Sequence, residues 1–390
     1  MKRSLFALCI LGVGELWPTP LPAQTTPTAK PASKVILDTD IGDDIDDAFA
    51  LALALRSPEI EVIGITTAWG NTALRAKLAN RLVKEAGVRS IPVLAGVPTA
   101  SDSNFTQSEW ASEGEAAPAH PDAVEFLLEQ AKNAPGEVTL LTIGPLTNIA
   151  AAIDQDAEGF RKFKRVVLMG GSIRRGYGDL GYRPDHGPQP EYNIYRDVKA
   201  AQKLLASGVA IFMMPLDSTQ LLLDENKRTL LFSTGSPLTN ALAALYFQWV
   251  RVTRTPTATL FDAMAVGYTV KPELCPVEPM HITVDETGMT KPTTGTPNAS
   301  VCLASDSERF FHFLLPRLME PSLAIHKLSQ GPTQGYFNGV FPHGECNRQA
   351  DTTDVDEHSD DHEFEGKGIS ISLGKGNHDS RHEKVDGDTV

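Results

Sequence analysis

Two kinds of hydrophobic pattern alternate along the chain between about residues 34 and 330. Short β-branched runs predict strands at 34–40, 60–68, 91–96, 137–145, 163–171 and 209–217. Runs with helical periodicity lie between them, at 46–57, 71–87, 123–134, 146–153 and 197–208. This alternation is typical of a single α/β domain built on a doubly wound, mostly parallel sheet with helices on both faces.

Polar residues and glycines follow the predicted strands at their carboxyl ends. They are Asp38, Asp40, Asn71, Gly144, Gly170 and Asp217. Ligands of open parallel sheets bind beyond the carboxyl ends of the strands. We therefore expect one site to collect these residues.

The densest group of charges is the segment DTDIGDDIDD, in which six aspartates fall within ten residues. Asp38 and Asp40 are two apart in an extended segment and face the same side, whereas Asp46 and Asp47 begin a helix whose dipole favours anions. Four bare carboxylates would repel one another, so a hard divalent cation is the simplest remedy. Oxygen ligands favour calcium or magnesium over zinc, and calcium tolerates an irregular loop better. The alternative is a solvated acidic helix start.

DTDIGDDIDDAFALALAL resembles the signature of the inosine-uridine preferring nucleoside hydrolases, with two extra residues between its aspartate pairs. Further matches follow in order: GITTAWGN ending at Asn71, LTIGPLTNIA from Leu141, VVLMGG from Val166, EYN from Glu191 and FDAMAVGY around Asp262. The resemblance covers about residues 34–325. It implies a nucleoside hydrolase-like fold and calcium-dependent hydrolysis of the N-glycosidic bond of ribonucleosides, giving ribose and free base.

The resemblance also assigns roles residue by residue. Asp40 is the implied general base, acting on a metal-bound water. The implied calcium ligands are Asp40, Asp47, Asp262 and the backbone carbonyl of Ile143. The implied ribose contacts are Asp46, Asn71, Glu191 and Asn193, with Met169 behind the sugar. Asp38 matches an acidic position beyond the metal ligands.

This residue set suits the implied reaction for physical reasons. Cleavage of an N-glycosidic bond builds positive charge on the ribosyl ring, and surrounding carboxylates stabilise that charge. A cation that holds the 2′- and 3′-hydroxyls makes the site selective for ribose, because a deoxy sugar leaves partners unpaired.

Several positions depart from the family's pattern. Studied members have a histidine directly before the last metal aspartate, where this chain has Phe261, which cannot donate a proton. The family's asparagine before the Glu191 match is also absent, and Asp185 and His186 stand nearby instead. His186 is a candidate acid or a solvent-facing loop residue, and His120 is a candidate substrate contact or a surface residue. The inserted Asp43 and Asp44 have no counterpart, so their roles stay open.

Two other functions fit parts of the sequence. A secreted calcium- and ribose-binding pseudo-enzyme would keep the site without efficient activation of the leaving base, as Phe261 suggests. A phosphatase of the haloacid-dehalogenase type also has a DxD pair after its first strand, but a small polar pair usually follows there, whereas Ile41 and Gly42 follow here.

The ends of the chain differ from its middle. Residues 1–23 have the charge, apolar stretch and small residues of a signal peptide, and 24–33 read as a linker. Residues 34–330 are the predicted hydrolase domain, and 331–390 form an acidic tail poor in large apolar residues, for which we expect disorder. We expect export to the periplasm or the extracellular space.

Cysteine content and charge limit the partners. Cys275, Cys302 and Cys346 would remain after removal of the signal peptide, which allows at most one intrachain pair. The net charge of −14 argues against nucleic acid and anionic membranes as partners. The expected partner is a ribonucleoside, and the resemblance implies a homo-oligomer, either a dimer or a tetramer.

Overall fold

The computed structural model describes residues 32–88, 91–101, 105–115 and 122–320. The predicted signal peptide, the tail 331–390, His120, Cys346 and all but the end of the predicted linker lie outside these residues. No helix among the described residues is long and apolar enough to cross a membrane.

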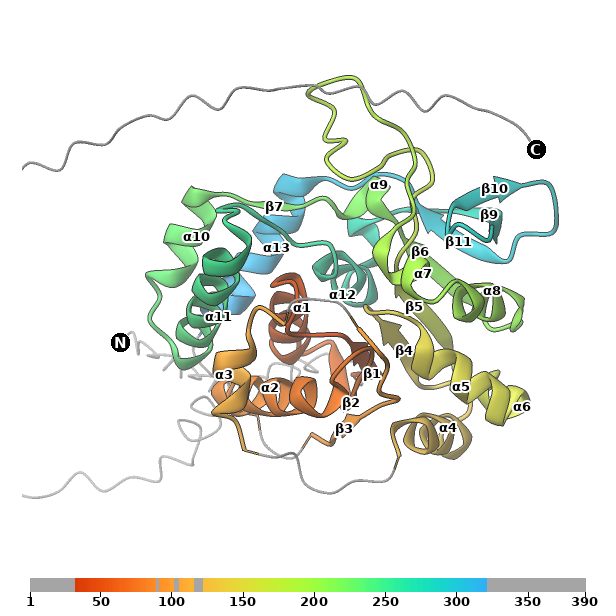
Figure 1. Ribbon diagram of the computed structural model, residues 1–390, viewed down its shortest axis with the longest axis horizontal. Helices are drawn as coiled ribbons and strands as arrows, with labels where there is room; N and C mark the ends of the chain where they lie inside the picture. Colours follow the sequence, from red (N-terminus) through yellow and green to blue (C-terminus); the bar gives the residue numbers. More distant parts are fainter. Residues whose placement is uncertain (1–31, 89–90, 102–104, 116–121, 321–390) are drawn as a thin grey trace, which may run out of the picture. The chain divides into compact units, whose positions relative to one another are not determined.

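The described residues form a sheet of nine strands in the order β10-β9-β11-β6-β5-β4-β1-β2-β3 (Figure 1). The strands are β1 (Ser33–Thr39), β2 (Ile60–Thr67), β3 (Val93–Ala95), β4 (Thr139–Thr142), β5 (Arg165–Met169), β6 (Ile211–Met214), β9 (Val277–Val284), β10 (Thr290–Thr293) and β11 (Ala299–Cys302). The strands from β3 to β11 pair in parallel, and β9 pairs antiparallel with both β11 and β10. The predicted, mostly parallel sheet is confirmed.

Helices cover both faces of the sheet because successive residues of a strand point to opposite sides. Val35 and Leu37 of β1 belong to one apolar cluster, and Ile36 between them belongs to the other. The first cluster includes residues of α1 (Asp46–Leu55), α2 (Thr72–Glu85), α3 (Ser108–Ser112), α10 (Glu225–Phe232), α11 (Pro237–Thr253), α12 (Ala263–Val270) and α13 (Ser307–Met319). The second includes residues of α4 (Ala123–Asn133), α5 (Thr147–Gln155), α6 (Ala157–Phe160), α7 (Tyr192–Arg196) and α8 (Val198–Ala206).

The remaining elements are short. They are α9 (Leu216–Thr219), the 3₁₀ helix η1 (Pro272–Leu274), and the strands β7 (Leu222–Leu223) and β8 (Ala258–Thr259), which pair with each other. All eleven elements predicted between residues 34 and 217 are present. The antiparallel strands β9 and β10 extend the sheet at one end, beyond the parallel part.

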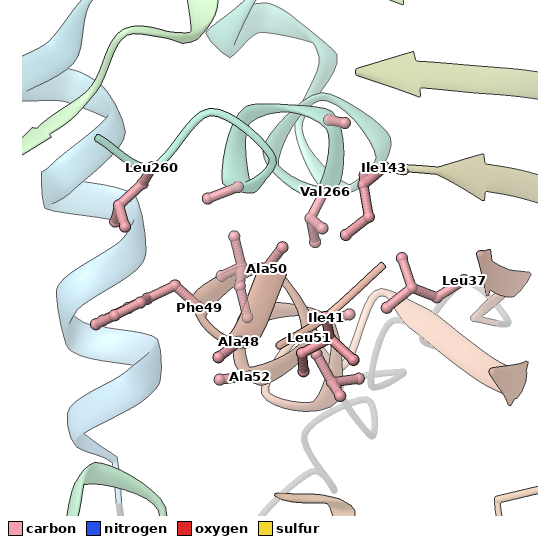
Figure 2. Packing of buried hydrophobic residues seen from close by; sticks show 14 of the residues in the cluster. Leu37, Ile41, Ala48, Phe49, Ala50, Leu51, Ala52, Ile143, Leu260 and Val266 are labelled. Carbon is pink, nitrogen blue, oxygen red and sulfur yellow. The ribbon is translucent and has the colours of Figure 1, made fainter. Parts of the chain in front are cut away.

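Helix α1 is buried on every side, which follows from its sequence DDAFALALAL. Figure 2 shows its residues Ala48 to Ala52 packed between the end of β1, Ile143 after β4 and Val266 of α12. The first turn of α1 carries Asp46 and Asp47. Packing of α1 against α12 therefore brings these two aspartates to Asp262, the residue before α12.

The segment between β1 and α1 is held by Arg75, a residue of α2 that is 1% exposed. Its Nε donates to the carbonyl of Trp69 (2.7 Å), and Nη1 donates to the carbonyls of Asp40 and Ile41. Nη2 forms an ion pair with Asp43 at 2.9 Å. Asp43, one of the inserted aspartates, is thus the counter-ion of a buried cation that fixes the backbone at Asp40.

The other inserted aspartate has different surroundings. Asp44 accepts a hydrogen bond from the backbone N–H of Ile45 at 2.7 Å, and burial raises its pKa. The carboxylate of Asp43 therefore pairs with Arg75, whereas burial disfavours the ionised form of Asp44.

One disulfide lies among the described residues, between Cys275 and Cys302, with Cα atoms 5.6 Å apart. Cys275 ends η1 and Cys302 ends β11, so the bond closes a segment that contains β9, β10 and β11. It joins the antiparallel part of the sheet to the end of α12, which precedes η1.

We expect replacement of both Cys275 and Cys302 by alanine to lower the free energy of unfolding by about 3 kcal/mol, the usual effect of a loop of this length. Urea unfolding with and without reductant measures it. Reductant should destabilise the parent protein and leave the double variant unchanged. An equal response of both proteins would contradict a stabilising role.

We expect Asp43→Asn to lower the free energy of unfolding by about 1–3 kcal/mol, because the buried Arg75 loses its ionic partner. Asp44→Asn is the matched control, since removal of a charge that burial disfavours should cost nothing. Thermal unfolding of both variants in chelator tests this difference. Equal stability losses in the two variants would refute the assigned role of Asp43.

Candidate active site

A cavity of about 410 Å³ opens at the carboxyl ends of the central strands. Its lining residues are Asp40, Asp43, Asp44, Asp46, Asp47, Ile143, Met169, Tyr177, Glu191, Tyr192, Asn193, Arg196, Phe261 and Asp262. Every predicted metal ligand lines it, and so do all the predicted ribose contacts except Asn71. The fold therefore brings together segments that lie far apart in the sequence.

Three buried carboxylates form the part of this cavity that can hold a metal ion. Asp46, Asp47 and Asp262 each place an oxygen atom within 4.8 Å of the others. The backbone N–H of Asp262 donates to Asp46 Oδ2 at 3.3 Å, and Thr39 Oγ1 donates to Asp47 Oδ1. These bonds fix the orientation of two of the three side chains.

Burial and mutual repulsion both raise the pKa of Asp46, Asp47 and Asp262. Burial raises the pKa of Asp40, on the same cavity, to about 7, although the positive charge of Arg75 opposes the shift. A cation among these groups would relieve the repulsion and favour the ionised forms. Their oxygen-only donor set fits a hard divalent ion.

Ile143 reaches the cavity because the residue after it is a glycine. A Cβ atom on Gly144 would lie 2.8 Å from both the backbone nitrogen and Oδ1 of Asp40. The chain after β4 can therefore approach Asp40 closely only without a side chain at this position. This contact sets Ile143 beside the carboxylates.

The EYN motif forms the adjoining wall. Glu191 caps α7 and accepts backbone hydrogen bonds from Gly171 (3.0 Å), Asn193 (3.0 Å) and Ile194 (3.2 Å). Burial raises its pKa to about 7 against the effect of these bonds. Asn193 Nδ2 donates to the carbonyl of Met169 at 3.2 Å. Glu191 and Asn193 therefore have fixed positions beside the carboxylate group.

Aromatic rings form another part of the lining. Tyr177 and Phe261 meet edge to face, with ring centroids 5.8 Å apart. The backbone N–H of Tyr192 donates to the hydroxyl oxygen of Tyr177 at 2.9 Å. Tyr177 is 37% exposed as a whole residue, but desolvation of its hydroxyl raises its pKa, so the hydroxyl stays protonated at neutral pH. Burial raises the pKa of Tyr192 to about 12.

Some residues expected at one site lie elsewhere. Asn71 caps α2 through a bond from Leu74 N, is exposed, and lines a separate cavity with Asp43 and Arg75. Asp217 accepts the backbone N–H groups of Ile173 and Arg174 and lines a third cavity.

Asp38 is fully buried and is not among the residues that line the main cavity. Its Oδ1 accepts hydrogen bonds from Thr66 Oγ1 (2.5 Å) and Asn148 Nδ2 (2.7 Å). Burial raises its pKa to about 6. It supports the strand end that carries Asp40.

Neither His186, the candidate acid, nor Asp185 is among the residues that line the main cavity. The ring of His186 is exposed and bonds to Asp179 at 2.8 Å, and Asp185 lies 3.6 Å from Arg175. Sequence reasoning did not identify Tyr177 or Arg75 as functional. Tyr177 stands in the aperiodic segment GYGDL, and Arg75 reads as a surface residue of a helix.

Comparisons with known proteins agree with this geometry. The family model described as inosine-uridine preferring nucleoside hydrolase matches residues 35–312. Uridine nucleosidase 1 of Arabidopsis thaliana is 30% identical over 323 residues, which cover 74% of this chain and 94% of that protein. Pyrimidine-specific ribonucleoside hydrolase RihA of Citrobacter koseri is 30% identical over 320 residues, which cover 74% and 98%.

Solved structures show the same architecture. The plant nucleoside hydrolase PpNRh1 superimposes with a TM-score of 0.66 at 27% identity, covering 75% of this chain and all of that one. The family match over most of the domain, the relatives of similar length and the shared fold lead to one conclusion: the chain is an enzyme of the inosine-uridine preferring nucleoside hydrolase family.

Proposed function

We propose that this protein is an exported, calcium-dependent ribonucleoside N-ribohydrolase in which Asp40 is the general base. The observation that carries the proposal is the convergence of Asp46, Asp47 and Asp262 with Asp40 and the EYN motif in one cavity. Export is supported by the character of residues 1–23 and by the disulfide, since disulfides persist in oxidising compartments.

Calcium is the proposed ion because the donors are carboxylates and a backbone carbonyl from an irregular set of segments. Asp47 and Asp262 of the carboxylate cluster would hold it, together with Asp40 and the carbonyl of Ile143, which line the same cavity. Asp46, the third member of the cluster, would face the ribose. Bound there, it would supply positive charge that orients a water molecule and the ribose diol and lowers the pKa of that water.

The side chains have separate tasks in the reaction. Asp40 accepts the proton of the attacking water. Asp46, Glu191 and Asn193 bind the ribose hydroxyls, and Met169 packs behind the sugar ring. As the glycosidic bond breaks, the ring gains positive charge, and the surrounding carboxylates stabilise it in a site with little water.

The names of the relatives suggest which nucleobase the substrate carries. Two of them are named for uridine or pyrimidine ribonucleosides, and a structural neighbour from Gardnerella vaginalis, with a TM-score of 0.63 at 26% identity, is named as purine-preferring. We propose uridine as the first substrate to test, with inosine as its purine counterpart.

The proposal is tested by release of free base from uridine, inosine, their 2′-deoxy forms and nitrophenyl riboside, with calcium and with chelator. We expect cleavage of ribosides that chelator abolishes and calcium restores. The deoxy forms should react at least about tenfold more slowly, because the site loses a partner for its polar groups.

Asp40→Asn is the matched variant for this assay. It should lower kcat roughly 10²- to 10⁴-fold, since an amide cannot accept the proton, while the circular dichroism spectrum stays unchanged. Unchanged turnover would remove Asp40 from the mechanism. A parent protein that binds ribose and calcium without cleaving any riboside would instead be a binding protein.

We expect Asp262→Ala to weaken calcium binding at least about tenfold, because the cavity loses one of its three clustered carboxylates. Isothermal titration calorimetry with calcium measures the affinity. Asp185→Ala is the control, since this residue pairs with Arg175 on a loop and does not line the cavity. An unaltered affinity in Asp262→Ala would contradict the assigned metal site.

A further inference from the structure

We propose that Tyr177 is a catalytic residue whose hydroxyl donates a hydrogen bond to the departing base. The inference rests on the proposed hydrolase function and adds the group that assists the leaving base. Phe261 has no donor, and neither His186 nor Asp185 lines the main cavity. Among the described residues, the hydroxyl-bearing side chains of this lining are Tyr177 and Tyr192.

The cavity lining has two chemically different parts. One contains the clustered carboxylates of Asp46, Asp47 and Asp262, which suit a cation and a polyhydroxylated sugar. The other contains the rings of Tyr177 and Phe261, packed edge to face. A planar heterocycle fits an aromatic wall better than a group of carboxylates. The base of a bound nucleoside therefore lies against the two rings.

The hydroxyl of Tyr177 lies where these two parts meet. Its oxygen accepts the backbone N–H of Tyr192, the residue after Glu191, at 2.9 Å. Its ring meanwhile contacts Phe261. Glu191 belongs to the proposed ribose side, so the hydroxyl is next to the point where sugar and base are joined.

The hydroxyl proton of Tyr177 is available for a substrate. Its oxygen is an acceptor in the bond from Tyr192, and that bond leaves the hydroxyl proton free to point elsewhere. A tyrosine hydroxyl can donate and accept at the same time. Tyr177 can thus donate to a ring nitrogen or carbonyl oxygen of the base while the backbone holds its oxygen in place.

Tyr177 stands in a loop that is itself firmly held. The carboxylate of Asp179 accepts the backbone N–H groups of Gly176 (2.8 Å), His186 (2.8 Å) and Gly187 (3.0 Å). Backbone N–H groups of Tyr177 and Gly178 donate to the side chains of Gln189 and Gln220, at 3.3 and 2.7 Å. These bonds fix the backbone on both sides of Tyr177.

A second tyrosine of the cavity is a competitor for the role. The hydroxyl of Tyr192 is buried and has no hydrogen-bond partner among the described residues. The charges that act on it are those of Asp40, Asp43, Arg196 and Arg75, and Arg196 lies over its ring. The carboxylates of Glu191, Asp46 and Asp44 act on Tyr177 in the same way, so nearby charge does not separate the two tyrosines. The observation that favours Tyr177 is its ring contact with Phe261.

The oxygen of water bonds to C1′ of the ribose, and a water proton passes to Asp40. The electron pair of the broken C1′–N bond goes to the base. Tyr177 stabilises this negative charge by its hydrogen bond while the base takes a proton from solvent, and Asp40 returns its own proton to solvent. Hydrogen bonds to charged groups are stronger than neutral ones, so the contact favours the transition state over bound substrate.

The test is Tyr177→Phe, which removes only the hydroxyl, assayed for kcat/KM on uridine, inosine and nitrophenyl riboside with calcium. Nitrophenolate leaves without help, whereas natural bases need it. We expect kcat/KM for the natural nucleosides to fall at least about tenfold and that for nitrophenyl riboside to change less than about twofold. Tyr182→Phe, in the same loop and 85% exposed, should leave both unchanged.

Other outcomes of this assay would contradict the role of Tyr177. Equal losses on all substrates, or no loss, would refute the role of Tyr177 while the hydrolase function stands. The same selective loss in Tyr192→Phe, with Tyr177→Phe unaffected, would give the role to Tyr192 instead. A parent protein that cleaves only nitrophenyl riboside has no working donor, which also refutes the inference. A parent that cleaves no riboside refutes the proposed function, and the Tyr177 inference falls with it.

Discussion

Negative charge buried at one edge of the sheet is the constraint on which the rest of this structure depends. Asp46, Asp47 and Asp262 crowd into a space in which their carboxylates repel one another, and burial removes the water that would solvate them. The fold can hold them there because they lie at the starts of α1 and α12, where helix dipoles favour anions. The apolar body of α1 secures those ends against the sheet and α12.

The buried cation of Arg75 stabilises the segment between β1 and α1, which carries Asp40. Arg75 binds the carbonyls of Asp40 and Ile41 and pairs with Asp43, so one of the inserted residues helps to hold the backbone of Asp40, the proposed general base. An arginine suits this place because its planar group donates in several directions at once. The insertion thus has a structural reason that the sequence motif alone did not reveal.

Much of the fold was predictable because it depends on local periodicity. The run Val35, Ile36, Leu37 reads as a buried strand, and the structure divides these residues between the two apolar clusters on either face. Most site residues were predictable because strand ends in a parallel sheet meet at one edge. Asn71 caps α2 and lines a separate cavity, so its predicted ribose contact stays a prediction.

The features that sequence reasoning missed share a different physical origin. Arg75 looks like a solvent-facing residue of an amphipathic helix, and contacts with the segment between β1 and α1, with Trp69 and with Phe105 make it buried. Tyr177 has no periodic context, because hydrogen bonds to Asp179, Gln189 and Gln220 hold its segment instead of a strand or helix. Long-range contacts of this kind leave no local signal in the sequence.

The two parts of the cavity are consequently built in different ways. Its carboxylates stand at the ends of strands and the starts of helices, whose positions are set by the packed core, so the carboxylate part of the cavity is rigid. Tyr177 is carried by the long segment between β5 and α7, held by side chains that can change without disturbing the core. Loops tolerate substitution better than the elements they connect. Alterations in this loop can therefore reshape the aromatic part of the cavity, while its carboxylate part stays fixed by the fold.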